Sequence, residues 1–167
     1  GVYTIAFLEA NPHLQAVIFD LEHVIPLTKR FIQEHGLEDR VSYAPGDFYR
    51  HQLPQGCDLA LLSAIIHQNS RQENRELYTA IRKALQPGGR LLIRDHIMDE
   101  TRTKPAAGAM FALNMLVNTQ GGDTYTLSEV RQDLHSAGFE NIQALRTGQD
   151  SFERMDCLVE ARTPGST

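Results

Sequence analysis

Apolar and polar positions alternate along the chain in blocks that match strands and helices. Four short apolar runs have the length of strands: residues 14–20, 40–44, 58–63 and 90–97. Three segments around them have helical patterns: residues 2–10, 25–35 and 72–85. Apolar strands that alternate with helices are typical of a parallel sheet covered on both faces.

Helix-ending and helix-starting signals support this division. Gly36 stands where a left-handed C-cap would follow the second helix. Thr126-Leu-Ser-Glu129 is a capping box that opens a helix to about Ala137, and Gly138 ends it.

The last third of the chain changes character. A helix rich in Ala and Met is predicted at residues 105–119, and two further strands near residues 142–147 and 152–161. With no repeat or internal linker, the sequence predicts one α/β domain over residues 1–162 and a disordered tail at 163–167.

Composition narrows the possible partners. The 167 residues carry a net charge of -5, which argues against nucleic acid because phosphate binding needs clustered Lys and Arg. No apolar run approaches the ~18 residues that would span a bilayer, so no membrane partner is expected. Cys57 and Cys157 lie far apart in strand-like segments, which favours free thiols of a reducing, cytoplasmic compartment over a disulfide.

Polar residues follow the ends of four consecutive predicted strands: Asp20, Asp47, His67 and Asp95. Open α/β sheets bind ligands beyond the carboxyl ends of their strands. Asp20 could accept the hydroxyls of a ribose, and Asp47 an exocyclic amine, with Phe48 facing a purine. His67 could act as a general base, with Asp95 orienting its imidazole.

Each of these residues also has a structural interpretation. Asp20 could be a helix N-cap, Asp47 a turn acid beside a core aromatic, and His67 a capped histidine at a helix start. A local pair of Asp95 with Arg94 is disfavoured because neighbouring strand residues face opposite sides. The clustering at strand ends favours a functional role.

Other catalytic patterns fit less well. Tyr78 and Arg82 imitate the Tyr-x-x-x-Lys pair of short-chain dehydrogenases, but Arg replaces the Lys and both residues fall within a helix. No Gly-x-Ser-x-Gly elbow is present. No metal is expected, because metal-ligand spacing is absent from five histidines: His13, His23, His35, His51 and His135.

The order of these motifs resembles the S-adenosylmethionine-dependent O-methyltransferases of the acetylserotonin and caffeic acid type. The similarity is carried by "VIFDL", "GDFY", "LLSAIIHQNS", "ALQPGGRLLIRDHIMDE", "FALNMLVNTQGG" and "TLSEVRQDLHSAGF". It implies a Rossmann-like class I methyltransferase fold: a mostly parallel sheet, helices on both faces, and an antiparallel last strand.

The resemblance also implies a role for each matching residue. His67 matches the catalytic base, and Asp95 an acid that helps to hold it. Six residues would bind S-adenosylmethionine: Gly1, Asp20, Leu21, Asp47, Phe48 and Ser63. Four residues would line the acceptor pocket: Met110, Phe111, Asn114 and Met115. The implied reaction is methyl transfer to a hydroxyl of a small aromatic or enolic acceptor.

Two departures from the family pattern keep a second class of protein open. His67-Gln68-Asn69 stands where the family usually has His-Asp-Trp, and Thr124, with Asp123 before it, stands where many members have a glutamate. The alternative is a cofactor-binding but non-catalytic subunit or regulator. A nicotinamide oxidoreductase is a third reading, which lacks its Tyr/Lys pair.

The start of the chain gives a further expectation. Gly1 would be the last glycine of the family's cofactor loop, so the family's preceding central strand would be absent. A parallel sheet without its middle strand leaves buried backbone groups unpaired, at about 1–3 kcal/mol each. We therefore expect a fragment of a longer protein whose upstream helical segment forms a homodimer.

Overall fold

The computed structural model describes residues 1–50, 52–146, 155 and 157–165. Residues 51, 147–154, 156 and 166–167 lie outside the described residues. They include Thr147, at the end of one predicted strand, and residues 152–154 and 156 of the predicted last strand. The chain divides into two compact units, Gly1–Pro54 and Gln55–Thr167, and each is described by itself.

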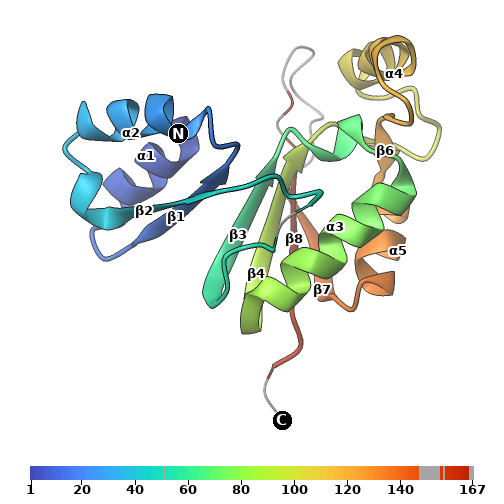
Figure 1. Cartoon of the computed structure of the whole chain (residues 1–167). Helices are drawn as coiled ribbons and strands as arrows, with labels where there is room; N and C mark the ends of the chain where they lie inside the picture. The colour runs from blue at the N-terminus through green and yellow to red at the C-terminus, as the bar shows by residue number, and fades with distance from the viewer. Residues whose placement is uncertain (51, 147–154, 156, 166–167) are drawn as a thin grey trace. The chain divides into compact units, whose positions relative to one another are not determined.

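The first unit is a two-stranded parallel sheet with its helices on one face (Figure 1). Its elements run in the order α1 (Val2–Ala10), β1 (Ala16–Asp20), α2 (Ile25–Gln33), a 3₁₀ turn (Glu38–Arg40) and β2 (Val41–Pro45). Ala16 lies opposite Val41 and Asp20 opposite Pro45, so the carboxyl ends of both strands lie at one edge.

The core of this unit is built by residues at helical and strand periods. Leu8 of α1 and Ile32 of α2 are fully buried, and alternate strand residues such as Ile18 and Tyr43 pack against them. Val17, which points to the other face of β1, is 43% exposed. These strands therefore bury one face within the unit, whereas the sequence suggested burial on both.

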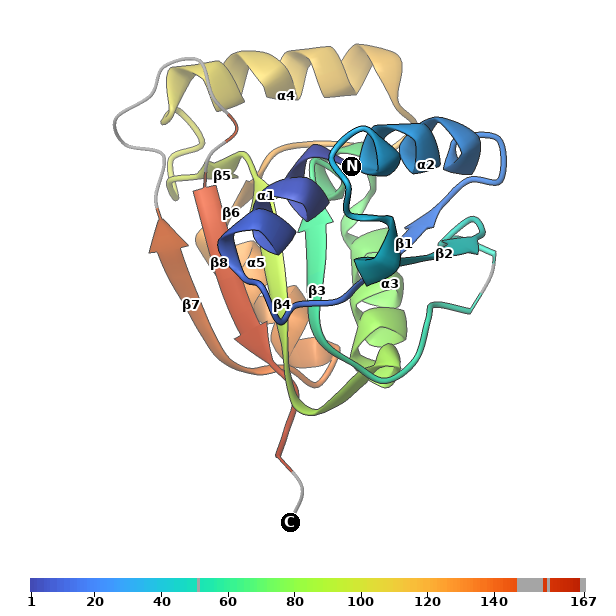
Figure 2. The same cartoon turned by 90° about the vertical axis from the view of Figure 1, so that its left-hand side faces the viewer.

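The second unit holds a four-stranded mixed sheet in the order β3-β4-β8-β7, visible side by side in Figure 2. Its elements are β3 (Cys57–Ser63), η2 (Ile66–Gln68), α3 (Arg71–Ala84), β4 (Leu85–Asp95), β5 (Ile97–Met98), α4 (Ala106–Asn118), β6 (Tyr125–Thr126), α5 (Leu127–Ser136), β7 (Glu140–Arg146) and β8 (Cys157–Arg162). β3 and β4 are parallel, and β8 is antiparallel to both β4 and β7. The prediction of an antiparallel last strand is confirmed.

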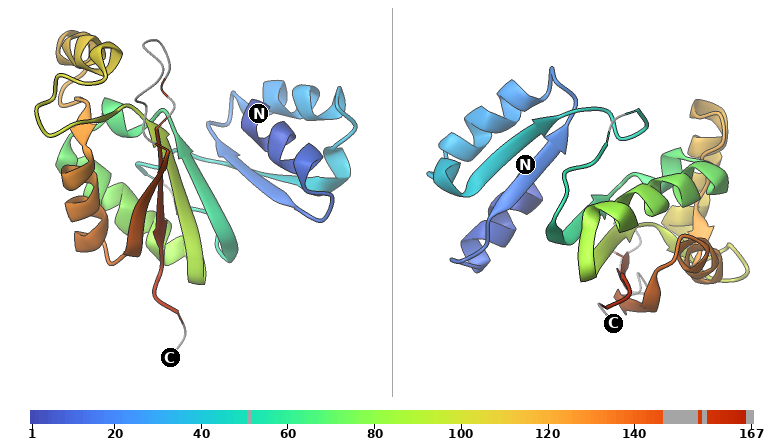
Figure 3. Two further views of the ribbon diagram at one scale, coloured as in Figure 1. Left: turned by 180° about the vertical axis from the view of Figure 1, so that it is seen from behind. Right: turned by 60° about the horizontal axis from the view of Figure 1, so that its bottom comes forward.

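Helices α3 and α5 lie along the same face of this sheet (Figure 3). Leu91, Ile93, Val159 and Ala161 are buried at 1% exposure or less, as the strand alternation requires. Leu61, on the opposite face of β3, is 36% exposed. In the first unit α1 and α2, and in the second unit α3 and α5, thus cover one face of the sheet.

The predicted start and end signals of α5 are confirmed. Thr126 and Glu129 form the capping box of α5, and Gly138 after its end has φ 87°. A second capping box, Ser70 with Glu73, opens α3. It was not predicted, although the Ser-x-x-Glu spacing is present in the sequence.

Two features differ from the sequence expectations. β5 and β6 form a parallel pair of two residues each, too short to give a periodic signal. The segment expected to be a disordered tail begins with ordered contacts, because the Thr163 amide donates to Gly89 O and Gly88 N to Pro164 O.

Cys57 and Cys157 are free thiols.

No helix in the described ranges is long and apolar enough to cross a membrane. Among the same residues, no group of three or more His, Cys, Asp or Glu side chains could hold a metal ion.

The guanidinium of Arg40 joins three parts of the first unit. It donates to Leu8 O at 3.0 Å, to Asn11 O at 2.5 Å and to Leu14 O at 2.8 and 3.0 Å. These carbonyls belong to the end of α1 and the loop into β1, so the side chain fixes the entry of that strand.

We predict that Arg40→Ala lowers the free energy of unfolding of the first unit by about 2–3 kcal/mol, because charge-assisted hydrogen bonds to several carbonyls are lost. Urea unfolding followed by circular dichroism measures this. Arg30→Ala is the matched control, since Arg30 has a 79% exposed side chain and a surface ion pair worth about 0.5 kcal/mol. Equal effects of the two variants would contradict the prediction.

Candidate functional site

The second unit brings together a histidine and a carboxylate predicted from the sequence. His67 lies in the short η2 turn after β3, and Asp95 is the last residue of the neighbouring parallel strand β4. His67 Nδ1 lies 2.8 Å from Asp95 Oδ1 and 3.1 Å from Oδ2. Their side chains are 8% and 1% exposed. Two residues that are 28 positions apart thus form a buried pair at the carboxyl edge of the sheet.

The carboxylate of Asp95 fixes which ring nitrogen of His67 carries a proton. Its Oδ1 also accepts from the amide of His96 at 2.8 Å, so the carboxylate is held on two sides. A carboxylate only accepts hydrogen bonds, and Nδ1 of His67 therefore donates to it. In the neutral imidazole this leaves the lone pair on Nε2, on the far side of the ring.

Helix α4 places an aromatic ring against this pair. The ring of Phe111 lies 4.9 Å from that of His67 in an edge-to-face arrangement and 5.0 Å from that of His96. Gly108 allows the close approach, because a Cβ there would lie 2.5 Å from Met98 Sδ of β5. Figure 2 shows α4 across the end of the sheet where β3 terminates.

The other three residues predicted to line an acceptor pocket lie differently on α4. Met115 is buried, Met110 is 67% exposed, and Asn114 is exposed, with its side chain accepting from Asn118 Nδ2. Of the four, Phe111 has a ring contact with His67.

The backbone of the His67 turn (residues 64–70) is held by side chains that sequence reasoning missed. Asn74 Nδ2 donates to Ile66 O at 2.9 Å, and Asn69 Nδ2 donates to Asn74 Oδ1 at 3.1 Å. The hydroxyl of Tyr125 donates to Asn69 O. Burial, aided by the nearby charges of Asp123 and Glu129, raises the pKa of Tyr125 above its ordinary value, so this donor keeps its proton.

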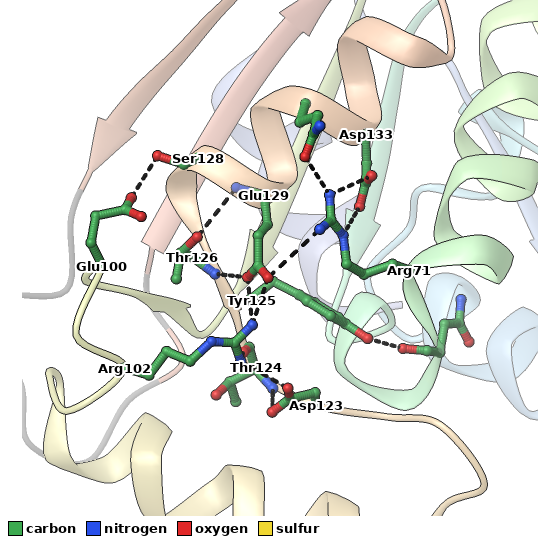
Figure 4. A network of polar contacts seen from close by, with 12 residues as sticks. Arg71, Glu100, Arg102, Asp123, Thr124, Tyr125, Thr126, Ser128, Glu129 and Asp133 are labelled. Carbon is green, nitrogen blue, oxygen red and sulfur yellow. Dashed lines mark hydrogen bonds and ion pairs between the residues drawn. The ribbon is translucent and has the colours of Figure 1, made fainter.

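A network of charges surrounds the start of α5 and the two ends of the α4 segment (Figure 4). Arg102 donates to both carboxylate oxygens of Glu129 at 2.6 and 2.7 Å, to Asp123 at 2.8 Å and to Thr124 O at 3.0 Å. Arg71 of α3 pairs with Asp133 of α5 at 2.8 Å. Arg102 precedes α4 and Asp123 follows it, so the network ties both ends of that segment to α5.

Glu129 is the centre of this network. Burial opposes its ionisation, but the Thr126 amide, the hydrogen bonds from Arg102 and the charges of Arg102 and Arg71 together lower its pKa below the ordinary 4.5. Its ionised form therefore stabilises the folded state.

The first unit carries four of the predicted cofactor residues at one strand edge, and Gly1 at the start of α1. Asp20 ends β1 and accepts from the amide of Leu21 at 2.8 Å. Asp47 follows β2 and accepts from the amide of Tyr49 at 2.9 Å, and the Phe48 ring contacts that of Tyr49 at 4.4 Å. Asp20 lies opposite Pro45 in the parallel β1-β2 pair, so both acids stand at the carboxyl edge of that pair.

Ser63 belongs to the second unit, where it ends β3 and accepts from Arg94 at 3.3 Å. The structure thus groups Asp20 with Asp47 in one unit, and Ser63, His67 and Asp95 in the other. That the two groups share a single ligand stays a prediction.

Comparison with solved structures identifies the fold. Human N-acetylserotonin methyltransferase, solved in complex with SAM, is 28% identical and matches 94% of this chain and 43% of its own, with a TM-score of 0.81. An O-methyltransferase family 2 protein from Planctomyces limnophilus, solved in complex with apigenin, is 28% identical and matches 98% of this chain and 48% of its own, with a TM-score of 0.87. The predicted class I methyltransferase fold is confirmed.

Comparison of sequences gives the family. The O-methyltransferase domain model matches residues 1–140, so the chain belongs to the O-methyltransferase domain family. It is 34% identical over 146 residues to 3-hydroxy-5-methyl-1-naphthoate 3-O-methyltransferase of Streptomyces sahachiroi, covering 87% of this chain and 42% of that protein. It is 34% identical over 139 residues to acetylserotonin O-methyltransferase of Gallus gallus, covering 83% and 39%. The chain spans about two fifths of the length of these curated relatives.

We predict that Glu129→Gln removes a pH-dependent part of the stability. A carboxylate with a lowered folded pKa stabilises above its unfolded value of 4.5, and this contribution disappears as the pH falls through the folded value. We expect the variant to lose about 1–2 kcal/mol at about pH 6 and to match the wild type near about pH 3.

Urea unfolding at both pH values measures the effect. Glu76→Gln is the control, because Glu76 is exposed on α3, where its carboxylate accepts a hydrogen bond from the Gln72 side chain. A difference between wild type and Glu129→Gln that is the same at both pH values would contradict the role of the charge.

Proposed function

We propose that the protein transfers a methyl group from S-adenosylmethionine to a hydroxyl of a small aromatic or enolic acceptor, with His67 as the general base. The observation that carries the proposal is the buried contact of His67 Nδ1 with Asp95 in a chain of the O-methyltransferase domain family. This contact leaves Nε2 as the proton acceptor.

The chemistry asks little more of the protein than position and proton removal. Bound S-adenosylmethionine supplies a methyl on a sulfonium, which already carries a neutral leaving group. Alignment of the acceptor oxygen with that methyl can lower the barrier by up to about 7–11 kcal/mol. General base help adds about 10²–10⁴-fold, and this is the part assigned to His67.

Asp95 would act by orienting the imidazole and by stabilising it once protonated. Its side chain is 1% exposed and accepts a second hydrogen bond from the His96 amide, so the carboxylate has little freedom to turn away. When His67 takes the proton of the acceptor hydroxyl, the positive charge forms beside this carboxylate.

The residues proposed for the cofactor fit its groups chemically. The Asp20 carboxylate at the end of β1 can accept the ribose hydroxyls, with Leu21 flanking the adenine. Asp47 can accept the adenine amine, with the Phe48 ring against the base. Gly1 would approach the cofactor chain closely, and Ser63 would lie near its methionine part.

The acceptor is proposed to be flat and apolar with one hydroxyl. Phe111 is the part of the proposed pocket that contacts the His67 ring, and Met110, Asn114 and Met115 lie on the same helix. The relatives support this class, since they are named for a hydroxynaphthoate and for acetylserotonin, and a related structure holds apigenin.

We predict that His67→Ala lowers the methylation rate by at least about 100-fold and leaves the affinity for S-adenosylmethionine nearly unchanged. Asp95→Asn should also lower the methylation rate, because the Asn amide can donate to Nδ1 of His67 and so favours the tautomer with the proton on Nε2. The rate is measured with N-acetylserotonin, 1-naphthol and hydroxynaphthoates, and the affinity by calorimetry.

His135→Ala is the control, since His135 is exposed in the last turn of α5. An unchanged rate in His67→Ala would refute the base assignment. Binding of S-adenosylmethionine without turnover of any phenol in the wild type would favour the non-catalytic subunit, and absence of binding would refute the proposed function.

A further inference from the structure

The turn that carries His67 is short and has three backbone hydrogen bonds: Gln68 N–H donates to Ile65 O, Asn69 N–H to Ile66 O, and Ala64 N–H to Arg94 O of β4. The 3₁₀ helix η2 is three residues long, and Ala64 before it has φ 58°, in the left-handed region. The carbonyls of Ile66 and Asn69 receive their side-chain hydrogen bonds from elsewhere in the unit. These side-chain hydrogen bonds add to the backbone bonds of the turn, so the direction of the His67 ring depends in part on them.

We propose that Asn69, Asn74 and Tyr125 are positioning residues that aim Nε2 of His67 at the acceptor hydroxyl. The proposal rests on the function proposed above, in which His67 is the base. None of the three side chains has to touch the acceptor for this role.

The two asparagines hold the turn from the side of α3. Both are 2% exposed, and each has a side-chain hydrogen bond within the pair: Asn69 donates to Asn74, and Asn74 donates to Ile66 O. Asn74 lies in the first turn of α3, where its backbone N–H also donates to Ser70 O. The start of α3 is thereby joined to the residue just before His67.

Tyr125 holds the turn from the side of Asp95. It is 4% exposed, and its backbone lies opposite Ile97 in the β5-β6 pair, two residues beyond Asp95 on the same segment. Its hydroxyl donates to Asn69 O, two residues beyond His67. One side chain thus connects the backbone around the proposed base with the backbone that carries its carboxylate.

Gly122 completes the enclosure on the same side. A Cβ at this position would overlap the carbonyl oxygen of His67 itself, so the 119–124 segment packs directly on the turn. Its amide donates to Thr119 Oγ1 at 2.8 Å, which keeps the segment in place.

This arrangement gives a physical reason for one departure from the family pattern. Asn69 stands where the family usually has an aromatic residue, and here its side chain and its carbonyl are both engaged in the hydrogen bonds that fix the turn. A buried polar network restricts a turn to one conformation when each member has a partner.

The test is a double-mutant cycle in the natural full-length protein. Tyr125→Phe removes one hydroxyl and keeps the ring, so the fold is preserved. We expect kcat with the best acceptor among N-acetylserotonin, 1-naphthol and hydroxynaphthoates to fall about 10- to 100-fold, and KM to change less than about threefold. In the His67→Ala background the same change should cause no further loss, because the group being positioned is gone.

A general structural role would give another result. Two outcomes would refute the positioning role and leave the base assignment standing. In one, Tyr125→Phe lowers kcat by the same factor in the wild type and in His67→Ala; in the other, it lowers kcat in neither. An unchanged rate in His67→Ala would instead refute the proposed function itself. Gln72→Ala is the matched control, since Gln72 is an exposed amide in the same first turn of α3, and no loss of kcat is expected.

A second measurement does not depend on the acceptor. In ¹⁵N-labelled protein, the imidazole nitrogens of His67 should show the tautomer protonated at Nδ1 in the wild type and an averaged signal in Tyr125→Phe and Asn74→Ala. Identical imidazole signals in the wild type and in folded Tyr125→Phe would overturn the proposal.

Discussion

The site of the second unit depends on the buried carboxylate of Asp95. Asp95 has 0% exposure, and a charge withdrawn from water in this way is tolerated only when it is paired and hydrogen-bonded. The imidazole of His67 and the amide of His96 supply those contacts. The parallel pairing of β3 with β4 makes this possible, because it sets the ends of both strands at one edge. The contact with His67 therefore pairs the buried charge of Asp95 and leaves Nε2 of the histidine as a defined proton acceptor. Stability and the proposed chemistry thus both depend on Asp95.

Around this pair, fixed charges hold the segments that have little regular structure. The loops on either side of α4 make few ladder hydrogen bonds, and Arg102 joins them to Glu129, which also caps α5. Glu129 thus has two duties, since its carboxylate ends the network and satisfies the Thr126 amide at the helix start. A helix such as α4, whose outer face is largely apolar and exposed, is placed over the site by contacts at its two ends and by Gly108 and Phe111 in its first half.

The sequence could predict the pair but not its support. His67 and Asp95 were found because both follow apolar runs, and the carboxyl ends of parallel strands meet at an edge whatever the residues between them. Tyr125 and Asn69 are 56 residues apart and are joined by one hydroxyl and one carbonyl, which leave no periodic signal. The pocket residues came from resemblance, which assigns a helix but not the rotation of each side chain, and Met110 is accordingly 67% exposed.

The polar residues beside His67 can be understood as a change in how the proposed base is held, with the histidine itself retained. A histidine needs two constraints to present Nε2 in one direction: a partner for Nδ1 and a backbone that does not move. Asp95 supplies the partner for Nδ1. That partner would be of little use on a mobile backbone, because the imidazole would move together with residues 64–70. Gln68 and Asn69 would count against activity if they left that turn unsupported. Asn69 is instead 2% exposed and hydrogen-bonded through both its side chain and its carbonyl. The loss of the usual aromatic therefore does not by itself argue for an inactive protein.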